Sequence, residues 1–242
     1  MIDRKELKER AKAAFKANYW RSVIVSFVLS ALIGGSTAAS SSKTTESANQ
    51  AAGTDNVQDL TNAIKENPKV FAIIIGVIIT ILLIIFLVCA IIDAFVTNPA
   101  EVGCRSFFLR SSDNSETNVE EIKTGFVPSY MRNVKTMFLK DLYVGLWALL
   151  LIVPGVIKSY AYQLVPYILA EDPDIAPKDA LKLSEDMMNG HKKEAFLLDL
   201  SFLPWDILSV VTLGIAQVFY AGPYMRAADA EFYKAVKESY NA

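Results

Sequence analysis

One uncharged run constrains this chain more than any other feature. Residues 70–92 are 23 consecutive residues without a charge, an Asn, a Gln or a Pro. At about 1.5 Å per residue, a helix of this length crosses a hydrocarbon layer of about 30 Å with some tilt. A buried helix of a soluble protein would carry charged or amide side chains on one face, and this run has none. It therefore predicts a transmembrane helix.

The remaining apolar residues are clumped rather than periodic, which favours further spans. The chain has 242 residues, of which 52% are hydrophobic, and a mean hydropathy of +0.30. The sequence predicts an all-α, polytopic integral membrane bundle of about six transmembrane helices, with a range of five to six, forming one domain over residues 1–242. The expected spans are residues 19–37, a span over 70–92, two helices within 137–170, and two more at 195–213 and 214–228.

Charge patterning predicts the orientation in the cell membrane. The first 21 residues are rich in Lys and Arg, with acids interleaved at helical spacing. Basic segments beside a span stay in the cytoplasm, so six spans would leave both termini there. The interleaved acids and the greasy span that follows argue against a nucleic-acid-binding arm. The long charged region also argues against a cleaved signal peptide. Residues 1–18 are predicted to form a cytoplasmic amphipathic helix.

Three other segments have sequence patterns that predict a structural role. The Ser/Thr-rich stretch 38–66 predicts a flexible external loop. Residues 176–190 predict an interfacial helix on the cytoplasmic side, because Pro177 suits a first helical turn and Gly190 a helix stop. Small residues recur every fourth position in the first span, which predicts a packing face for a membrane-protein partner or a second copy. These residues are Ser22, Ser26, Ser30 and Gly34.

The apolar run at 149–173 is interrupted by Pro154, Gly155 and Pro166, with Lys158 between the breaks. Two interpretations are open. In a hairpin, the Pro-Gly pair forms the turn at the far surface, and the lysine reaches the outer headgroups. In a broken helix, the lysine is buried and must have a partner. The hairpin is favoured.

Ionisable residues inside predicted spans form a candidate intramembrane polar site. Asp199 and Asp206 lie seven residues apart and share a helix face if the helix continues through Pro204. The cations available to pair with them are Lys158 and Arg226. Charges at this depth are costly, so they either form a structural ion pair or line a proton or ion path.

The expected cytoplasmic face carries four further candidates, since basic groups there meet lipid phosphates. They are Asn98, Arg105, His191 and Lys192. His191 is the only histidine, and a metal site would need more His or Cys ligands. No HExxH, GxSxG or P-loop motif is found. The sequence therefore predicts no catalytic residue, no metal and no cofactor. Membrane lipids are the expected partners, and nucleic acid is not.

Four blocks in order carry a resemblance to a known family. They are "NPAEVGCRSFF" (98–108), "PGVIKSYAYQLVPYILAEDP" (154–173), "ALKLSEDMMNGHKKEAFLLDLSFLPW" (180–205) and "GPYMRAADAEFY" (222–233). Together they resemble a bacterial family of multi-pass membrane proteins described as domain of unknown function 975. That family is distantly similar to the membrane domain of glycerophosphodiester phosphodiesterases. Pro204 and Asp206 depart from its pattern. The resemblance implies a location and an architecture but no activity.

Two functions from different classes follow. The leading hypothesis is a non-enzymatic membrane module that binds or organises a protein or lipid partner at its cytoplasmic face. The alternative is a small transporter or permease that uses the Pro154-Gly155 break together with Asp199 and Asp206. A lipid-acting enzyme has only the distant family association in its favour.

Overall fold

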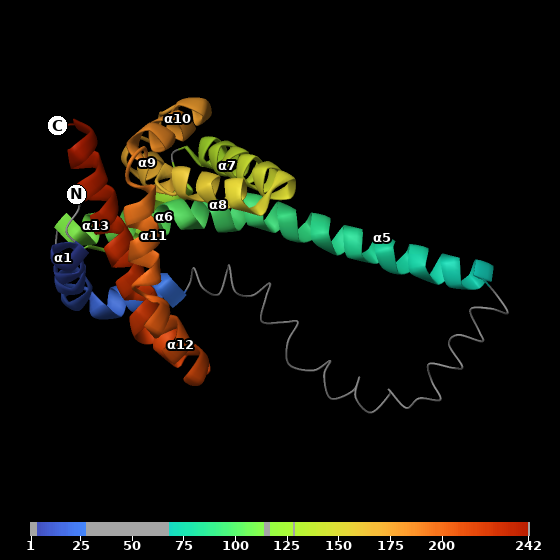
Figure 1. Cartoon of the computed structure of the whole chain (residues 1–242), viewed down its shortest axis with the longest axis horizontal. Helices are drawn as coiled ribbons and strands as arrows, with labels where there is room; N and C mark the ends of the chain where they lie inside the picture. The colour runs from blue at the N-terminus through green and yellow to red at the C-terminus, as the bar shows by residue number, and fades with distance from the viewer. Residues whose placement is uncertain (1–3, 28–67, 114–116, 128, 242) are drawn as a thin grey trace. The chain divides into compact units, whose positions relative to one another are not determined.

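The computed structural model describes residues 4–27, 68–113, 117–127 and 129–241, and it is all-helical over these ranges (Figure 1). The predicted all-α class is confirmed. The expected loop 38–66, Ser30 and Gly34 lie outside the described residues. Contacts divide the chain into two units, residues 31–93 and residues 1–30 with 94–242, and each is described by itself.

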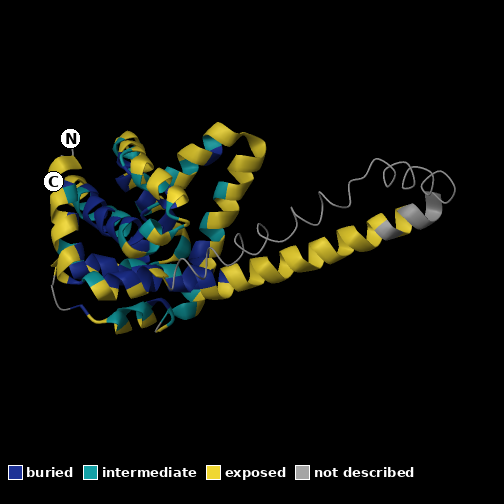
Figure 2. Ribbon diagram, turned by 90° about the horizontal axis from the view of Figure 1, so that it is seen from below, coloured by how far each residue is buried: buried dark blue, intermediate teal, exposed yellow. Residues whose placement is uncertain are grey.

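Helix α5 (Pro68–Ile92) carries the uncharged run of the first unit. Its first residue is a proline, which suits the first turn of a helix because the missing N–H would have no partner there. Every residue of α5 whose exposure is described is exposed (Figure 2). Among the described residues, one continuous helix, Ile75–Asp113, is long and apolar enough to cross a membrane. The other five crossings predicted from the sequence are not confirmed by that criterion.

Helix α6 (Asn98–Asp113) lies at the centre of the second unit, although it is rich in polar residues. Two glycines let its neighbour η2 approach: a Cβ on Gly103 would lie 2.0 Å from the carbonyl oxygen of Ile122, and one on Gly125 would lie 1.9 Å from that of Pro99. No larger residue fits at either position. The elements that pack on α6 are α1 (Arg4–Ala17), η2 (Val119–Gly125), α7 (Tyr130–Leu150), α9 (Val165–Glu171) and α13 (Gly222–Asn241).

Helix α1 is amphipathic and packs on α13 and α6 (Figure 1). It buries Leu7, Ala11 and Phe15, the face that the sequence spacing predicts. Residues 19–27 continue as helix, and there Ser22 and Ser26 are each only 1% exposed. These two small residues are therefore buried within this chain.

Helices α7 and α8 (Ile152–Ala161) form a hairpin. The chain reverses at Leu151, whose backbone is extended with φ −156° and ψ 134°. The Pro154-Gly155 pair is not the turn, as the hairpin interpretation expected, because it lies in the first turns of α8. A Cβ on Gly155 would lie 2.5 Å from the Cα of Ala148, so the glycine serves close packing of α7 against α8. Pro166 begins α9 after a break that follows α8.

The C-terminal part holds four shorter elements before α13. The predicted helix at 176–190 corresponds to α10. Asp199 and Asp206 do not share one continuous helix, because Pro204 opens a new helix and the chain breaks before it. A tight turn follows, in which Leu213 (φ 51°) and Gly214 (φ 87°) are left-handed. The elements are α10 (Pro177–Met187), α11 (Lys192–Leu200), α12 (Leu203–Val211) and η3 (Gln217–Ala221).

Candidate functional site

The turn between α7 and α8 and the turn after α12 both expose large apolar side chains. At the α7–α8 tip, defined as residues 149–153, five consecutive apolar residues are between 61% and 87% exposed. At the turn after α12, Val210, Val211 and Leu213 are between 75% and 94% exposed. Runs of this kind mark surfaces that face something other than water.

The charges of the α7–α8 hairpin lie away from its tip. Lys140 and Asp141 occupy the middle of α7, and Lys158 lies near the end of α8. The Lys158 Nζ donates to Glu185 Oε1 of α10 at 2.6 Å and lies 5.5 Å from the Tyr162 ring centroid. Lys158 is therefore not at the turn, as the hairpin interpretation had it, because the chain reverses at Leu151 and Lys158 lies near the other end of α8.

A buried ion-pair network joins α6, α9 and α13. Arg105 Nη1 donates to Asp229 Oδ2 at 2.7 Å and to the Tyr167 hydroxyl at 3.0 Å. Tyr167 stacks on Tyr233 with ring centroids 5.0 Å apart, and the Tyr233 hydroxyl donates to Glu171 Oε2 at 2.7 Å. Asp229 thus pairs with Arg105 of α6, 124 positions away in the chain.

Opposite charges lie close together in this network. Arg105 lies 2.7 Å from Asp229 and 3.4 Å from Glu101, and Lys140 lies 4.0 Å from Glu101. Cys104 of α6 is fully buried and packs in the core.

Beside the network lies a cavity of about 390 Å³ between α6, α7 and the end of α8, here called the α6–α7–α8 cavity. Its volume falls in the range of about 300–1,000 Å³ that is typical of small-molecule sites. Two buried polar atoms of its lining residues, Arg105 Nε and Gln163 Oε1, have no hydrogen-bond partner in the described part of the chain. The polar residues that line it are Glu101, Arg105, Lys140, Asp141, Ser159, Tyr162 and Gln163.

The ion pairs at the mouth of this cavity are loose. Lys140 Nζ lies 3.4 Å from Asp141 Oδ1 and 4.0 Å from Glu101 Oε2. Arg105 Nη2 is 3.4 Å from Glu101 Oε1. Asp141 also accepts a 2.8 Å hydrogen bond from Asn98 Nδ2. Contacts of this length leave donors and acceptors free to exchange partners with a ligand.

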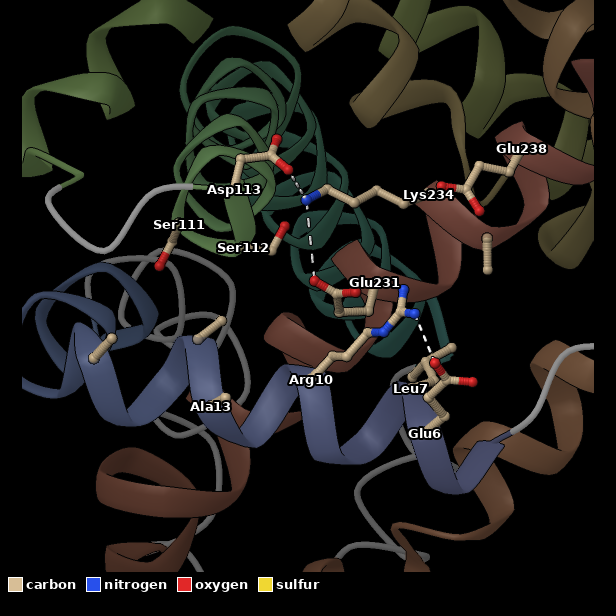
Figure 3. Close-up of a pocket in the computed structure, with 13 residues that line it drawn as sticks. Glu6, Leu7, Arg10, Ala13, Ser111, Ser112, Asp113, Glu231, Lys234 and Glu238 are labelled. Carbon is tan, nitrogen blue, oxygen red and sulfur yellow. Dashed lines mark hydrogen bonds and ion pairs between the residues drawn. The ribbon is translucent and has the colours of Figure 1, made fainter.

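A second hollow, of about 630 Å³, lies between α1, the end of α6 and α13 (Figure 3). Figure 3 shows Lys234 extended between Asp113 and Glu231, while Arg10 pairs with Glu6 at 2.6 Å. Burial raises the pKa of Glu231. None of the described residues that line this second hollow has a buried polar side-chain atom without a hydrogen-bond partner, unlike Arg105 and Gln163 of the α6–α7–α8 cavity, so it is the weaker candidate for a ligand.

The four residues of the predicted intramembrane site do not come together. No described hydrogen bond or ion pair joins Lys158, Asp199, Asp206 and Arg226 to one another. Asp199 instead accepts a 2.8 Å hydrogen bond from the Tyr160 hydroxyl. Asp206 is partly exposed on α12, and Arg226 is partly exposed on α13.

The predicted face residues have separate roles. Asn98 is buried and binds Asp141, and Arg105 belongs to the network. His191 precedes α11 and places Nδ1 2.9 Å from Glu194 Oε2. Lys192 opens α11 and is partly exposed. Among the described residues, no group of three His, Cys, Asp or Glu could hold a metal ion.

Sequence reasoning missed most of the cavity lining. Glu101, Lys140, Asp141 and Gln163 were not singled out, although one signal was available. Lys140 and Asp141 interrupt a helix that is otherwise apolar after Met137, and adjacent opposite charges in such a segment indicate a polar site.

Over the described residues, fold and site together define an all-α protein with one candidate transmembrane helix and with a charged cavity at the base of an apolar hairpin. Residues 21–240 match the family described as "Protein of unknown function (DUF975)", and the chain belongs to that family. The resemblance to this family predicted from four sequence blocks is confirmed. No curated protein and no solved structure matches the chain significantly. The distant similarity to the membrane domain of glycerophosphodiester phosphodiesterases stays a prediction.

Proposed function

We propose that this chain is a multi-pass protein of the cell membrane, without enzymatic activity, that binds or organises a lipid or protein partner through the charged base of its α7–α8 hairpin. The observation that carries the proposal is the segregation within that hairpin. Lys140, Asp141 and Lys158 lie at the base, and the tip is exposed and apolar.

Exposure of the apolar side chains of the hairpin tip to water is energetically unfavourable. Burying a Leu, Ile or Val side chain contributes about 1.5–3 kcal/mol relative to leaving it in water, and residues 149–153 are all of these types. A bilayer provides this burial without a protein partner. The same argument applies to the exposed face of α5.

The length of the apolar second half of α7 supports an estimate of how deeply the hairpin enters the bilayer. From Asp141 to Leu150, α7 rises by about 14 Å, which is close to half of a hydrocarbon layer of about 30 Å. We infer that the hairpin enters one leaflet and returns to the cytoplasmic side, while α5 and the span predicted from the sequence at 19–37 cross the whole bilayer. Six full crossings, with both termini in the cytoplasm, are the competing proposal.

The transport alternative has less support. It uses the Pro154-Gly155 break together with Asp199 and Asp206 as one path. Asp199 hydrogen-bonds Tyr160, whereas Lys158 pairs with Glu185 of α10. A partner or second copy bound through the small-residue stripe is also a weaker proposal, because Ser22 and Ser26 are already buried in this chain.

Cysteine accessibility tests the proposal. Cys89 and Cys104 are replaced by Ala, a single cysteine is placed at Lys158 or at Leu151, and an impermeant maleimide is added to cells and to inverted vesicles. We expect Lys158→Cys to react only in inverted vesicles and Leu151→Cys to react in neither. Alkaline carbonate extraction, which strips peripheral proteins, should leave both variants in the membrane.

Other outcomes have definite meanings. Labelling of Leu151→Cys from outside the cell would show that the hairpin crosses fully, in favour of six spans. Release of the protein by carbonate would contradict an integral membrane protein altogether.

A further inference from the structure

We propose that the α6–α7–α8 cavity binds the headgroup of a phospholipid that carries a primary ammonium beside its phosphate, the phosphatidylethanolamine class. The inference rests on the proposed function, because the acyl chains of such a lipid need the hairpin to lie in a bilayer.

The charge balance of the lining favours a zwitterion. Two carboxylates, Glu101 and Asp141, and two cations, Arg105 and Lys140, line the cavity, and Arg105 also pairs with Asp229 outside the lining. A purely anionic headgroup would pair with the cations and leave the carboxylates uncompensated in a half-buried site, and a pure cation would do the reverse. A ligand with one charge of each sign satisfies both sets.

The hydrogen-bond donors and acceptors of the lining also match the two ends of a zwitterionic headgroup. Arg and Lys only donate, so they match phosphate oxygens, and Arg105 Nε is a buried donor without a partner. Ionised carboxylates only accept, and the unpartnered Gln163 Oε1 is a further acceptor. An ammonium with three N–H groups matches these acceptors.

The same lining argues against choline lipids. A quaternary ammonium has no N–H to donate and is recognised by the faces of several aromatic rings. Tyr162 is the one aromatic residue among the residues that line this cavity. Carboxylates and an amide oxygen therefore select a primary ammonium over a trimethylated one.

The hairpin offers a path for the acyl chains. The cavity continues to Val144 and Gly145 of α7. A Cβ on Gly145 would meet nothing within 4 Å, so the surface there is open. Beyond it, Leu146 and Leu150 are 62% and 68% exposed. A headgroup in the cavity would thus lie at the depth of the bilayer interface, with its chains along α7.

The loose ion pairs at the mouth allow entry. Lys140 can leave its contacts of 3.4 Å and 4.0 Å for a phosphate. The short 2.7 Å pair between Arg105 and Asp229 lies behind them and stays. Binding therefore exchanges weak contacts for charge-assisted ones without opening the core.

Trp147 of α7 serves as a built-in reporter. The full chain, with Trp20 and Trp205 replaced by Phe, is reconstituted into vesicles that contain phosphatidylcholine and one lipid with brominated acyl chains, which quench nearby tryptophan. The brominated lipid is phosphatidylethanolamine, phosphatidylcholine or phosphatidylglycerol in turn. We expect phosphatidylethanolamine to quench Trp147 with a relative binding constant at least about fivefold above the other two.

Two variants test the assignment. Asp141→Asn keeps the side-chain shape and an acceptor for Asn98. In this variant the binding constant for phosphatidylethanolamine should become about equal to those for the other two lipids. The matched control Asp174→Asn, whose side chain is 88% exposed, should keep the preference for phosphatidylethanolamine. Equal quenching by all three lipids, a preference for phosphatidylglycerol, or an unchanged preference in Asp141→Asn would overturn the inference.

The source of the headgroup is tested in the same vesicles. Soluble O-phosphoethanolamine should not displace the brominated lipid at millimolar concentration, and displacement would assign the cavity to a soluble compound instead. If the protein is not retained by the vesicles, the proposed membrane function fails. If it is retained and shows no lipid preference, only the cavity assignment fails.

Discussion

Helix α6 and the second half of α7 show opposite relations between composition and burial. Helix α6 contains Glu101, Arg105 and several other polar residues, yet most of it is buried. The second half of α7 is almost wholly apolar, yet Leu142, Leu146 and Leu150 are more than half exposed. In a water-soluble protein the second pattern would be costly. The difference teaches that the two regions have different surroundings, which are protein for α6 and, under the proposed function, lipid for the second half of α7.

The variant that tests this comparison with the largest expected effect removes Arg105, the cation of the buried network, and lowers the free energy of unfolding. Arg105→Ala leaves Asp229 as a buried, uncompensated charge, a change that typically costs about 3–5 kcal/mol. We expect a loss of this size in the free energy of unfolding, measured by denaturant titration in mild detergent.

The matched control is Arg110→Ala on the same helix. Arg110 is 56% exposed and pairs with Glu121 at 3.0 Å, and exposed pairs contribute about 0–1 kcal/mol. Equal losses in the two variants would mean that α6 is not the buried centre of its unit.

A charge at the tip should have the next largest effect, and on a different quantity. Leu150→Lys is expected to cost about 2.5–3.5 kcal/mol in membrane insertion, the usual cost of a lysine at the centre of a membrane helix. The unfolding free energy in detergent should not change, because the residue contacts little protein.

Met131→Lys is the comparison for that variant. Met131 is 52% exposed but lies in the first turn of α7, at the base. Its insertion should equal that of the unmodified chain, measured as the fraction resistant to carbonate extraction. A comparable loss in both variants would put the whole of α7 in lipid and contradict a hairpin of half depth.

Gly155 allows α8 to pack closely on the second half of α7. Gly155→Val forces atoms into the backbone of Ala148, and overpacking of this kind costs about 1–3 kcal/mol. Gly145→Ala, where the surface is open, should instead stabilise the helix by about 0.5–1 kcal/mol. Thermal unfolding in detergent distinguishes these opposite signs, and matching signs would argue against the close contact of the two helices.

The smallest effect concerns the ion pair at the base. Lys158 and Glu185 have side chains that are 24% and 40% exposed, so the coupling between them should be about 0–1 kcal/mol. A double-mutant cycle with Lys158→Gln and Glu185→Gln measures it, and high salt should weaken it further. A coupling well above this range would mean that the base is excluded from water.

Local pattern explains which parts could be predicted. The helical state of residues 70–92, the face of α1 with Leu7 and Phe15, and the helix start at Pro177 all follow from neighbouring residues. The family match followed from blocks that keep their order. These features depend on short-range spacing, which a single sequence contains.

The cavity depends on pairs far apart in the chain. Arg105 pairs with Asp229, and Lys158 with Glu185, and nothing near either residue indicates its partner. Gly155 was predicted as a bend because proline and glycine disfavour helix, whereas its role is to let Ala148 approach. A sequence shows that a glycine is present but not which backbone lies against it.

The pairing of Arg105 with Asp229 has a consequence for biosynthesis. The two residues are 124 positions apart, and at about 5–20 residues per second a ribosome needs about 6–25 s to make the intervening chain. During this interval α6 carries a guanidinium whose final partner does not yet exist. Until α13 emerges, the ion-pair partner of Arg105 within α6 is Glu101, and water must solvate the rest of the guanidinium in place of Asp229.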